Sequence, residues 1–169
     1  MLKLACCFAL LCFAFIPPIS GQINSQLSEI EQAQLEFDNG NYDKAIELSK
    51  TGVERARQTK NRASIPKGLD IIACSQISLK LYKEAAITLS ESLQEVSRFQ
   101  PNRYRRAIIY VQLAWLFRSQ HKYAEALFYS QKALAETPEK NIHVLGEHYL
   151  NIGHILFRLG FDISAIIWL

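Results

Sequence analysis

Glycine, proline and cysteine are scarce in this chain, with 7, 5 and 4 copies among 169 residues. Low-complexity and disordered chains are rich in glycine and proline and poor in apolar residues. Few glycines and prolines, together with an apolar content of 49%, therefore predict one ordered domain. The net charge of +3 is also small. It does not indicate a nucleic-acid partner, because such proteins concentrate Lys and Arg on one face.

Cysteine is almost absent beyond the start of the chain. Cys6, Cys7 and Cys12 lie within the first 12 residues, and only Cys74 follows. A single cysteine cannot form an internal disulfide, so we expect the fold to be held by packing alone. Lipid attachment is not favoured, since neither Cys6 nor Cys12 follows a complete apolar segment.

The first 21 residues differ in kind from the rest. Lys3 supplies a positive start, residues 4–16 carry no charge, and Pro17-Pro18 precede a short stretch of small residues. This order is typical of an export signal, and we expect cleavage near Gly21 and Gln22, with the mature chain periplasmic or extracellular. A spanning helix needs about 20 apolar residues. The alternative is an uncleaved signal that anchors the chain in the membrane.

Enzyme motifs are missing as well. The chain has no glycine-rich phosphate loop, no His-Glu-x-x-His, no serine elbow and no Cys-x-x-Cys. His143, His148 and His154 are five and six residues apart, whereas metal ligands on one helix face are three or four apart. We therefore predict no catalytic residue, no metal and no cofactor, and we expect His148 at the surface.

What the chain does contain is a repeated phrase. Its copies are Asn41-Tyr42-Asp43-Lys44-Ala45, Leu81-Tyr82-Lys83-Glu84-Ala85, Lys122-Tyr123-Ala124-Glu125-Ala126 and Phe161-Asp162-Ile163-Ser164-Ala165. The alanines are 40, 41 and 39 residues apart. Repetition at 20 to 50 residues marks a stack of similar units. Each phrase separates two patterns of helical period, so it predicts the turn of a helix pair whose second helix opens at the tyrosine.

A small residue recurs twelve positions before each repeated alanine. These residues are Ala33, Ala73, Ala114 and Gly153. Only a hydrogen or a methyl group fits where two helices cross closely, so this position predicts the crossing point within each pair.

At these positions the chain resembles the tetratricopeptide repeat (TPR) family. The third unit matches the family pattern best, through Tyr110, Leu113, Ala114, Phe117, Ala126, Ala133 and Pro138. The period of about 40 exceeds the usual 34 and is similar to that of the long repeats in kinesin light chains and bacterial sensory proteins. The first unit departs most, since Glu29 and Glu36 stand at apolar places, which suits an exposed end cap.

The resemblance implies an all-α, right-handed α-solenoid of antiparallel helix pairs with about three and a half repeats. It covers residues 22–169 behind the signal at 1–21. The expected units are 24–61, 62–101, 102–139 and an incomplete 140–169. The surplus length is expected in longer helices and at the joints near 54–61, 94–102 and 137–141.

In the TPR family the first helix of each pair lines a concave groove, and this implies a set of partner-binding residues here. They are Gln34, Asp70, Cys74, Val111, Trp115, Arg118, His154, Phe157 and Arg158. Tryptophan and arginine dominate many interfaces, which favours Trp115, Arg118 and Arg158. The alternative for Trp115 is a place in the core between adjacent pairs.

A basic cluster, Arg103-Tyr104-Arg105-Arg106, is better explained as a solvated helix start with the tyrosine packing inward than as a phosphate site.

The expected function is a non-catalytic scaffold that binds a protein or peptide. The alternative is the sensory front of a longer membrane-bound kinase or transcriptional regulator. This alternative depends on the apolar end at residues 163–169, which would leave a repeat stack without a polar cap. A membrane attachment other than the signal would then come only from sequence beyond Leu169.

Overall fold

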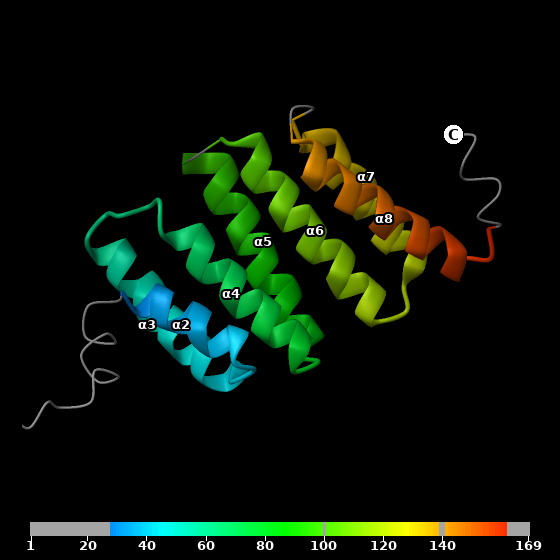
Figure 1. Ribbon diagram of the computed structural model, residues 1–169. Helices are drawn as coiled ribbons and strands as arrows, with labels where there is room; N and C mark the ends of the chain where they lie inside the picture. Colours follow the sequence, from blue (N-terminus) through cyan, green and yellow to red (C-terminus); the bar gives the residue numbers. More distant parts are fainter. Residues whose placement is uncertain (1–27, 100, 139–140, 162–169) are drawn as a thin grey trace, which may run out of the picture.

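The computed structural model describes residues 28–99, 101–138 and 141–161 (Figure 1). These ranges contain helices and no strand. The helices are α2 (Glu29–Asp38), α3 (Tyr42–Gln58), α4 (Ile65–Ser78), α5 (Tyr82–Phe99), α6 (Arg103–Ser119), α7 (Tyr123–Glu136) and α8 (Ile142–Arg158). The predicted export signal and the end of the fourth unit, residues 162–169, lie outside the described residues.

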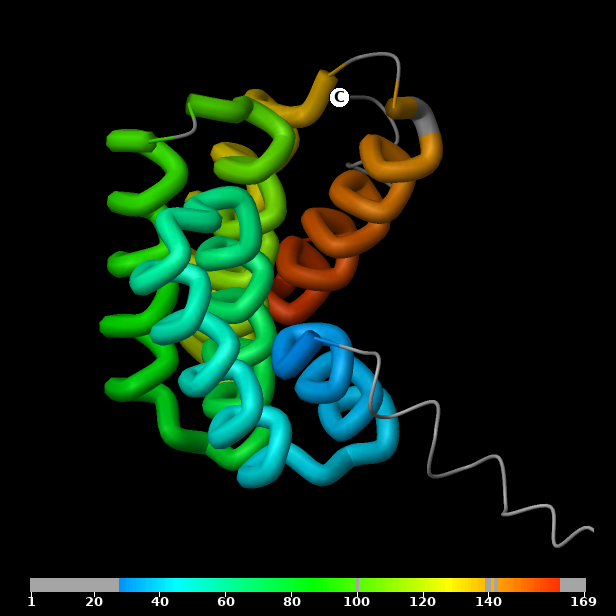
Figure 2. The backbone as a smooth tube through the Cα atoms, turned by 90° about the vertical axis from the view of Figure 1, so that its left-hand side faces the viewer, coloured from blue at the N-terminus to red at the C-terminus, as the bar shows by residue number. Residues whose placement is uncertain are grey.

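Successive helices pack against one another along the whole series, and tight turns join α2 to α3, α4 to α5 and α6 to α7. Contacts also run between α2 and α4 and between α4 and α6, so the first helices of consecutive pairs form a row of their own. This confirms the predicted all-α solenoid of helix pairs. Figure 2 shows α2 and α8 on the same side of the stack, at the two ends of that row.

The turn that follows each first helix has the same backbone conformation. In these four turns the residue with positive φ is Gly40, Lys80, His121 or Gly160, at 79°, 62°, 58° and 86°. In every case the following N–H donates to the carbonyl five residues earlier, at 2.8 to 3.1 Å. This is the Schellman ending of a helix, in which a left-handed residue lets the chain reverse. The repeated phrase therefore marks a repeated turn geometry, and Lys80 and His121 adopt a conformation that glycine adopts more easily.

The second helices begin at the repeated tyrosine. The first residues of α3, α5 and α7 are Tyr42, Tyr82 and Tyr123, which confirms the predicted starts. Two of these tyrosines also reach the next pair. The Tyr82 hydroxyl donates to the carbonyl of Ser119 at 3.3 Å, and Nε of Arg158 donates to the Tyr123 hydroxyl at 3.1 Å. Tyr82 and Tyr123 thus connect neighbouring units.

The small residues of the first helices lie where the sequence places them. Ala33, Ala73 and Ala114 are completely buried, as are the repeated alanines Ala45, Ala85 and Ala126. Gly153 differs, because no atom of the described chain lies within 4 Å of the place where its Cβ would be. The segment that corresponds to α3, α5 and α7 in the fourth unit begins among residues that the structure does not describe.

The largest apolar cluster joins the second and third pairs. Leu89 and Val96 of α5 pack with Ile77 of α4 and with Ile109 and Leu116 of α6, and all five are buried. Trp115 packs against this cluster from the outside. The cluster therefore fixes α6, the helix that supplies most of the site described below.

The first pair is held partly by ion pairs. Glu29 pairs with Arg55, and Glu36 pairs with Lys44 at 2.5 Å while it accepts from Nδ2 of Asn41 at 2.7 Å. These are the two glutamates that replace apolar residues of the repeat pattern. Their partners lie on α3 or in the turn before it, so the charges reinforce a pair that buries less apolar surface.

The long period is absorbed by long helices, which are the second helices of the first two pairs and the first helix of the third, since α6 has 17 residues and α7 has 14. The predicted joints at 54–61 and 94–102 are largely helical, since α3 continues to Gln58 and α5 to Phe99. α3 has 17 residues and α5 has 18.

Candidate protein-binding groove

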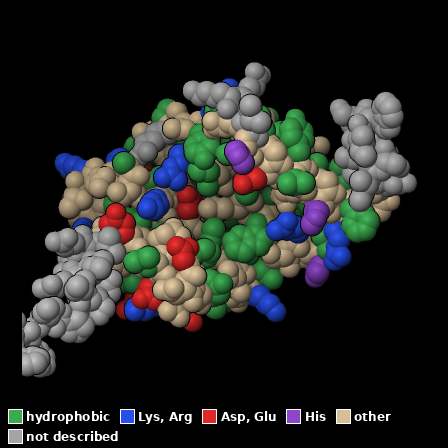
Figure 3. Space-filling model, viewed as in Figure 1, with side chains coloured by type: hydrophobic (Ala, Val, Ile, Leu, Met, Phe, Trp, Pro, Cys, Tyr) green, Lys and Arg blue, Asp and Glu red, His purple; other side chains and the backbone are tan. Residues whose placement is uncertain are grey.

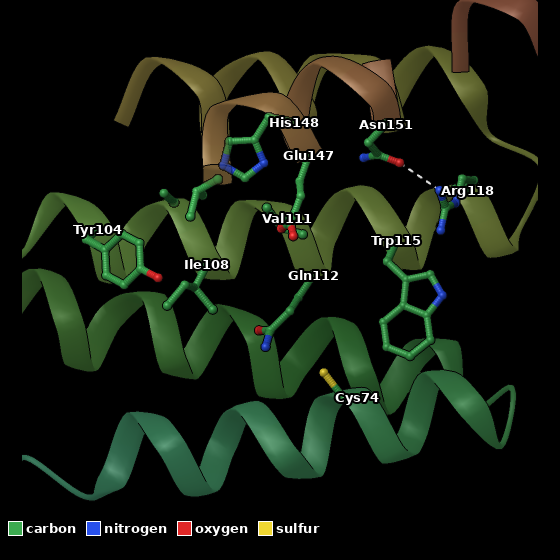
Figure 4. Close-up of a pocket in the computed structure, with 12 residues that line it drawn as sticks. Cys74, Tyr104, Ile108, Val111, Gln112, Trp115, Arg118, Glu147, His148 and Asn151 are labelled. Atoms are coloured by element: carbon green, nitrogen blue, oxygen red, sulfur yellow. Dashed lines mark hydrogen bonds between the residues drawn. The ribbon is translucent and has the colours of Figure 1, made fainter. Parts of the chain in front are cut away.

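The first helices share one face of the molecule, and a pocket opens in it. The pocket has a volume of about 450 Å³ and lies between α4, α6 and α8. Its lining residues are Cys74, Tyr104, Ala107, Ile108, Val111, Gln112, Trp115, Arg118, Val144, Glu147, His148 and Asn151. Figure 4 shows that Cys74 points from α4 toward Gln112 and Trp115 of α6, while α8 forms the opposite wall.

One stripe of α6 forms most of this lining. Tyr104, Ile108, Val111, Trp115 and Arg118 follow one another at spacings of four and three, so they lie on one face of the helix. The opposite side of α6 carries Ile109 and Leu116, which are buried in the apolar cluster with α4 and α5. Helical period alone therefore directs five large side chains into the pocket.

The floor of the pocket is apolar, and it includes the protonated thiol of Cys74. Burial, and to a smaller extent the Asp70 carboxylate, raises the pKa of the Cys74 thiol to about 12, against an opposing effect of the Gln112 side chain. The thiol is therefore a small apolar group at neutral pH and not a nucleophile. Beside it, Oε1 of Gln112 is buried with no hydrogen-bond partner among the described residues.

The rim is polar and held by hydrogen bonds. Arg118 donates from Nη1 to Oδ1 of Asn151 at 2.7 Å (Figure 4). Nδ2 of Asn151 in turn donates to the Ser130 hydroxyl at 3.1 Å. This chain of contacts joins α6, α8 and α7. It fixes the guanidinium of Arg118 at one end of the pocket while leaving the side chain exposed.

His148 differs from its expected place at the surface. It is 8% exposed, and its Nε2 lies 2.9 Å from the Thr137 hydroxyl. Burial lowers the pKa of His148, against an opposing effect of Glu147. The reason for the difference is the tilt of α8 toward the end of α7, which covers the imidazole and which helical spacing does not specify.

A second depression adjoins the pocket at the end of α8. It measures about 650 Å³ and is lined by Arg118, Tyr123, His154, Phe157 and Arg158. The Phe157 side chain is 60% exposed. Figure 3 shows histidine and Lys or Arg side chains close together toward the α8 end of this face, and hydrophobic side chains near its middle.

The structure brings seven of the nine predicted binding residues to these two hollows. Cys74, Val111, Trp115 and Arg118 line the pocket, and Arg118 also borders the depression that His154, Phe157 and Arg158 line. Trp115 fits both interpretations given above, because it packs on the core cluster and lines the pocket.

Two predicted residues lie elsewhere. Gln34 donates to Asp38 at 3.0 Å on α2. Asp70 is buried, where its carboxylate accepts from the Ser92 hydroxyl at 3.2 Å and from Arg105 at 3.2 Å. Burial raises the pKa of Asp70 to about 7, although Arg105 and the Ser92 hydroxyl lower it. Its position on α4 turns it toward α5 and α6 and away from the groove.

Sequence reasoning missed Tyr104, Ile108, Gln112, Glu147 and Asn151. Extending the α6 stripe backwards from Val111 at spacings of three and four would have found Tyr104 and Ile108. Extending the α8 stripe backwards from His154 at the same spacings would have found Asn151 and Glu147.

The basic cluster at the start of α6 has a structural role. Arg103 and Arg106 pair with Glu136 at 3.3 and 2.9 Å, and Arg105 pairs with Asp70. All three guanidinium groups thus have carboxylate partners within the chain. Tyr104 does not pack inward as expected, because it is 40% exposed at the edge of the pocket.

No protein-family model matches the sequence, and no curated relative is found. Among solved structures, the crystal structure of BtubC (BKLC) from P. vanneervenii is similar, with a TM-score of 0.68 and 21% sequence identity. The match covers 78% of this chain and 55% of that one, so the chain spans about half the length of BtubC. The fold is that of a TPR-like helical repeat protein. At this identity the likeness concerns the fold alone.

Among the described residues, no group of three His, Cys, Asp or Glu side chains could hold a metal ion. Within the same ranges, no helix combines the length and the hydropathy needed to cross a membrane.

Proposed function

We propose that the chain is a non-catalytic interaction module that binds an extended segment of a partner protein across its row of first helices. The observation that carries this proposal is the pocket between α4, α6 and α8. It combines an apolar floor with a polar rim, the composition typical of sites that hold an anchoring side chain.

The size of the pocket favours one large side chain as the anchor. A volume of about 450 Å³ lies within the range of roughly 300 to 1,000 Å³ found for small-ligand sites. Trp115 offers a broad flat surface to an apolar anchor. Arg118 stands at the end of the pocket, where it favours an acidic residue next to the anchor.

The test is selection of peptides from a random library displayed on phage, with the full chain immobilised as bait. Selected peptides are then measured by fluorescence polarisation against the parent chain and single variants. Trp115→Ala is expected to weaken binding about 30-fold, as for the dominant residues of an interface. Val111→Lys, which places a charge in the apolar lining, is expected to weaken it about as much.

Phe128→Ala provides the matched control. Phe128 is 50% exposed on α7 and does not line the pocket, so its loss removes a similar aromatic surface elsewhere. Peptides that bind all four proteins equally, with circular dichroism showing the same helicity, would contradict the groove assignment. Failure to select any peptide would contradict the proposed function itself.

We also propose that the chain acts outside the cytoplasm, because residues 1–21 have the order of an export signal. N-terminal sequencing of the protein recovered from an expressing bacterium tests this. A mature start at Gln22 supports export, and a retained Met1 in the cytoplasmic fraction argues against it.

A further inference from the structure

The arginines of this protein differ in their contacts. Six of the nine pair with carboxylates within the chain: Arg55, Arg57, Arg62, Arg103, Arg105 and Arg106. Arg98 lies 5.3 Å from the Phe99 ring. Arg118 and Arg158 instead contact neutral oxygens, those of Asn151 and Tyr123. Both line the same depression, and no carboxylate lines it among the residues described.

These neutral contacts orient the two guanidinium groups without using their charge. Nη1 of Arg118 donates to Asn151 at 2.7 Å, and Nε of Arg158 donates to the Tyr123 hydroxyl at 3.1 Å. Arg158 also lies over the Tyr123 ring, with Cζ at 5.6 Å from its centre. Each guanidinium has five N–H groups, so most of the donors on both remain available to an anion.

The same depression has an apolar side. The Phe157 side chain is 60% exposed and lines it together with the Tyr123 ring. An exposed phenylalanine beside two cations suits a ligand that joins an anionic group to an aromatic or other apolar body.

We propose that this depression, defined by Arg118, Arg158, Tyr123, His154 and Phe157, binds a phosphomonoester carried on an aromatic body. A carboxylate has one charge, and a single forked arginine satisfies it. A phosphate monoester has three oxygens and about two charges at neutral pH, which matches two arginines that have no carboxylate partner among the residues the structure describes. This site goes beyond the peptide groove, since Arg158 does not line the pocket that holds the anchor.

The experiment is titration of the full chain with phenyl phosphate, inorganic phosphate and benzoate at pH 7.5, followed by ¹H–¹⁵N NMR of the arginine Nε and histidine side chains. Phenyl phosphate is expected to shift the Arg118 and Arg158 signals in a saturable way and to bind at least tenfold more tightly than benzoate. Inorganic phosphate is expected to bind at the same residues more weakly, because it has no body to cover Phe157.

Arg158→Gln and Arg118→Gln are each expected to weaken phenyl phosphate binding about tenfold or more, the usual effect of losing a hydrogen bond to a charged group. Arg98→Gln is the control, because Arg98 is an exposed arginine that lies 5.3 Å from the Phe99 ring, outside the depression. It is expected to bind as the parent does.

Three results would overturn the proposal: benzoate binding as tightly as phenyl phosphate, inorganic phosphate binding equally well, or Arg158→Gln binding like Arg98→Gln while circular dichroism shows an intact helix content. None of these results depends on the peptide selection, so the two proposals can fail separately.

Discussion

Replacing Leu89 by alanine tests whether the cluster between the second and third pairs holds the solenoid together. Leu89 is completely buried in α5 and packs among residues of α4 and α6. The change removes about three methylene equivalents, or roughly 2.4 kcal/mol of transfer free energy. The cavity left behind adds to this, so we expect a total loss of about 3 to 5 kcal/mol in the free energy of unfolding.

Ile87→Ala is the matched comparison, two residues earlier on the same helix. Ile87 is 70% exposed, so only about a third of its transfer free energy, roughly 0.8 kcal/mol, is lost. The higher helix propensity of alanine returns about 0.4 kcal/mol. We therefore expect a net change within about 0.5 kcal/mol, nearly tenfold smaller than that of Leu89→Ala.

Urea unfolding followed by circular dichroism measures both variants, and the slope against urea shows whether the repeats still unfold together. In thermal unfolding of a chain of this size, the midpoint temperature of Leu89→Ala is expected to lie roughly 6 to 15 °C below that of the parent. If the two variants lost equal stability, the reasoning that this cluster unites the pairs would be refuted. The same conclusion would follow if Leu89→Ala changed only the slope.

Two further predictions concern the backbone turns and the buried carboxyl. Lys80→Gly is expected to raise the free energy of unfolding by about 0.5 to 1 kcal/mol, because Lys80 is exposed and held at φ 62°, a conformation that glycine adopts more easily. A loss of stability in urea unfolding would contradict this. The pKa of Asp70 is raised from 3.8 to about 7, so the folded chain binds more protons than the unfolded chain between these values, and its stability falls as the pH rises through them. Asp70→Asn removes this titration. The free energy of unfolding of the parent, relative to that of Asp70→Asn, is therefore expected to drop by on the order of a few kcal/mol from pH 5 to pH 8. Parallel pH profiles of the two proteins would show that Asp70 is not buried as described.

The sequence was sufficient for the architecture because the fold repeats. A tyrosine and an alanine that recur every 39 to 41 residues, with a small residue twelve positions earlier, specify the turns, the helix starts and the crossing points. The structure places Tyr42, Tyr82 and Tyr123 at the helix starts and buries Ala33, Ala73 and Ala114. These features are local, since each depends on the backbone conformation and packing of one helix pair.

The candidate site was predictable only in part. The stripe of α6 that contains Val111, Trp115 and Arg118 follows from helical period, and the pocket lies along it. Asp70 has the same register as Val111, yet its carboxylate is buried against Ser92 and Arg105. The position of a residue along its helix gives the direction in which its side chain points. Whether that side chain is buried depends on which side chains of the neighbouring helices lie opposite it.

The sequence by itself thus determined the repeat, its period, the turns and the face of each first helix, because these are fixed by local spacing and by the conformations that short stretches of backbone allow. Only the tertiary structure decided that α8 would close one side of a pocket, cover His148, and bring Arg118 and Arg158 to one depression without a carboxylate among its described lining residues. Those outcomes depend on the angles between helix pairs, which are set by the packing of side chains 30 or more residues apart.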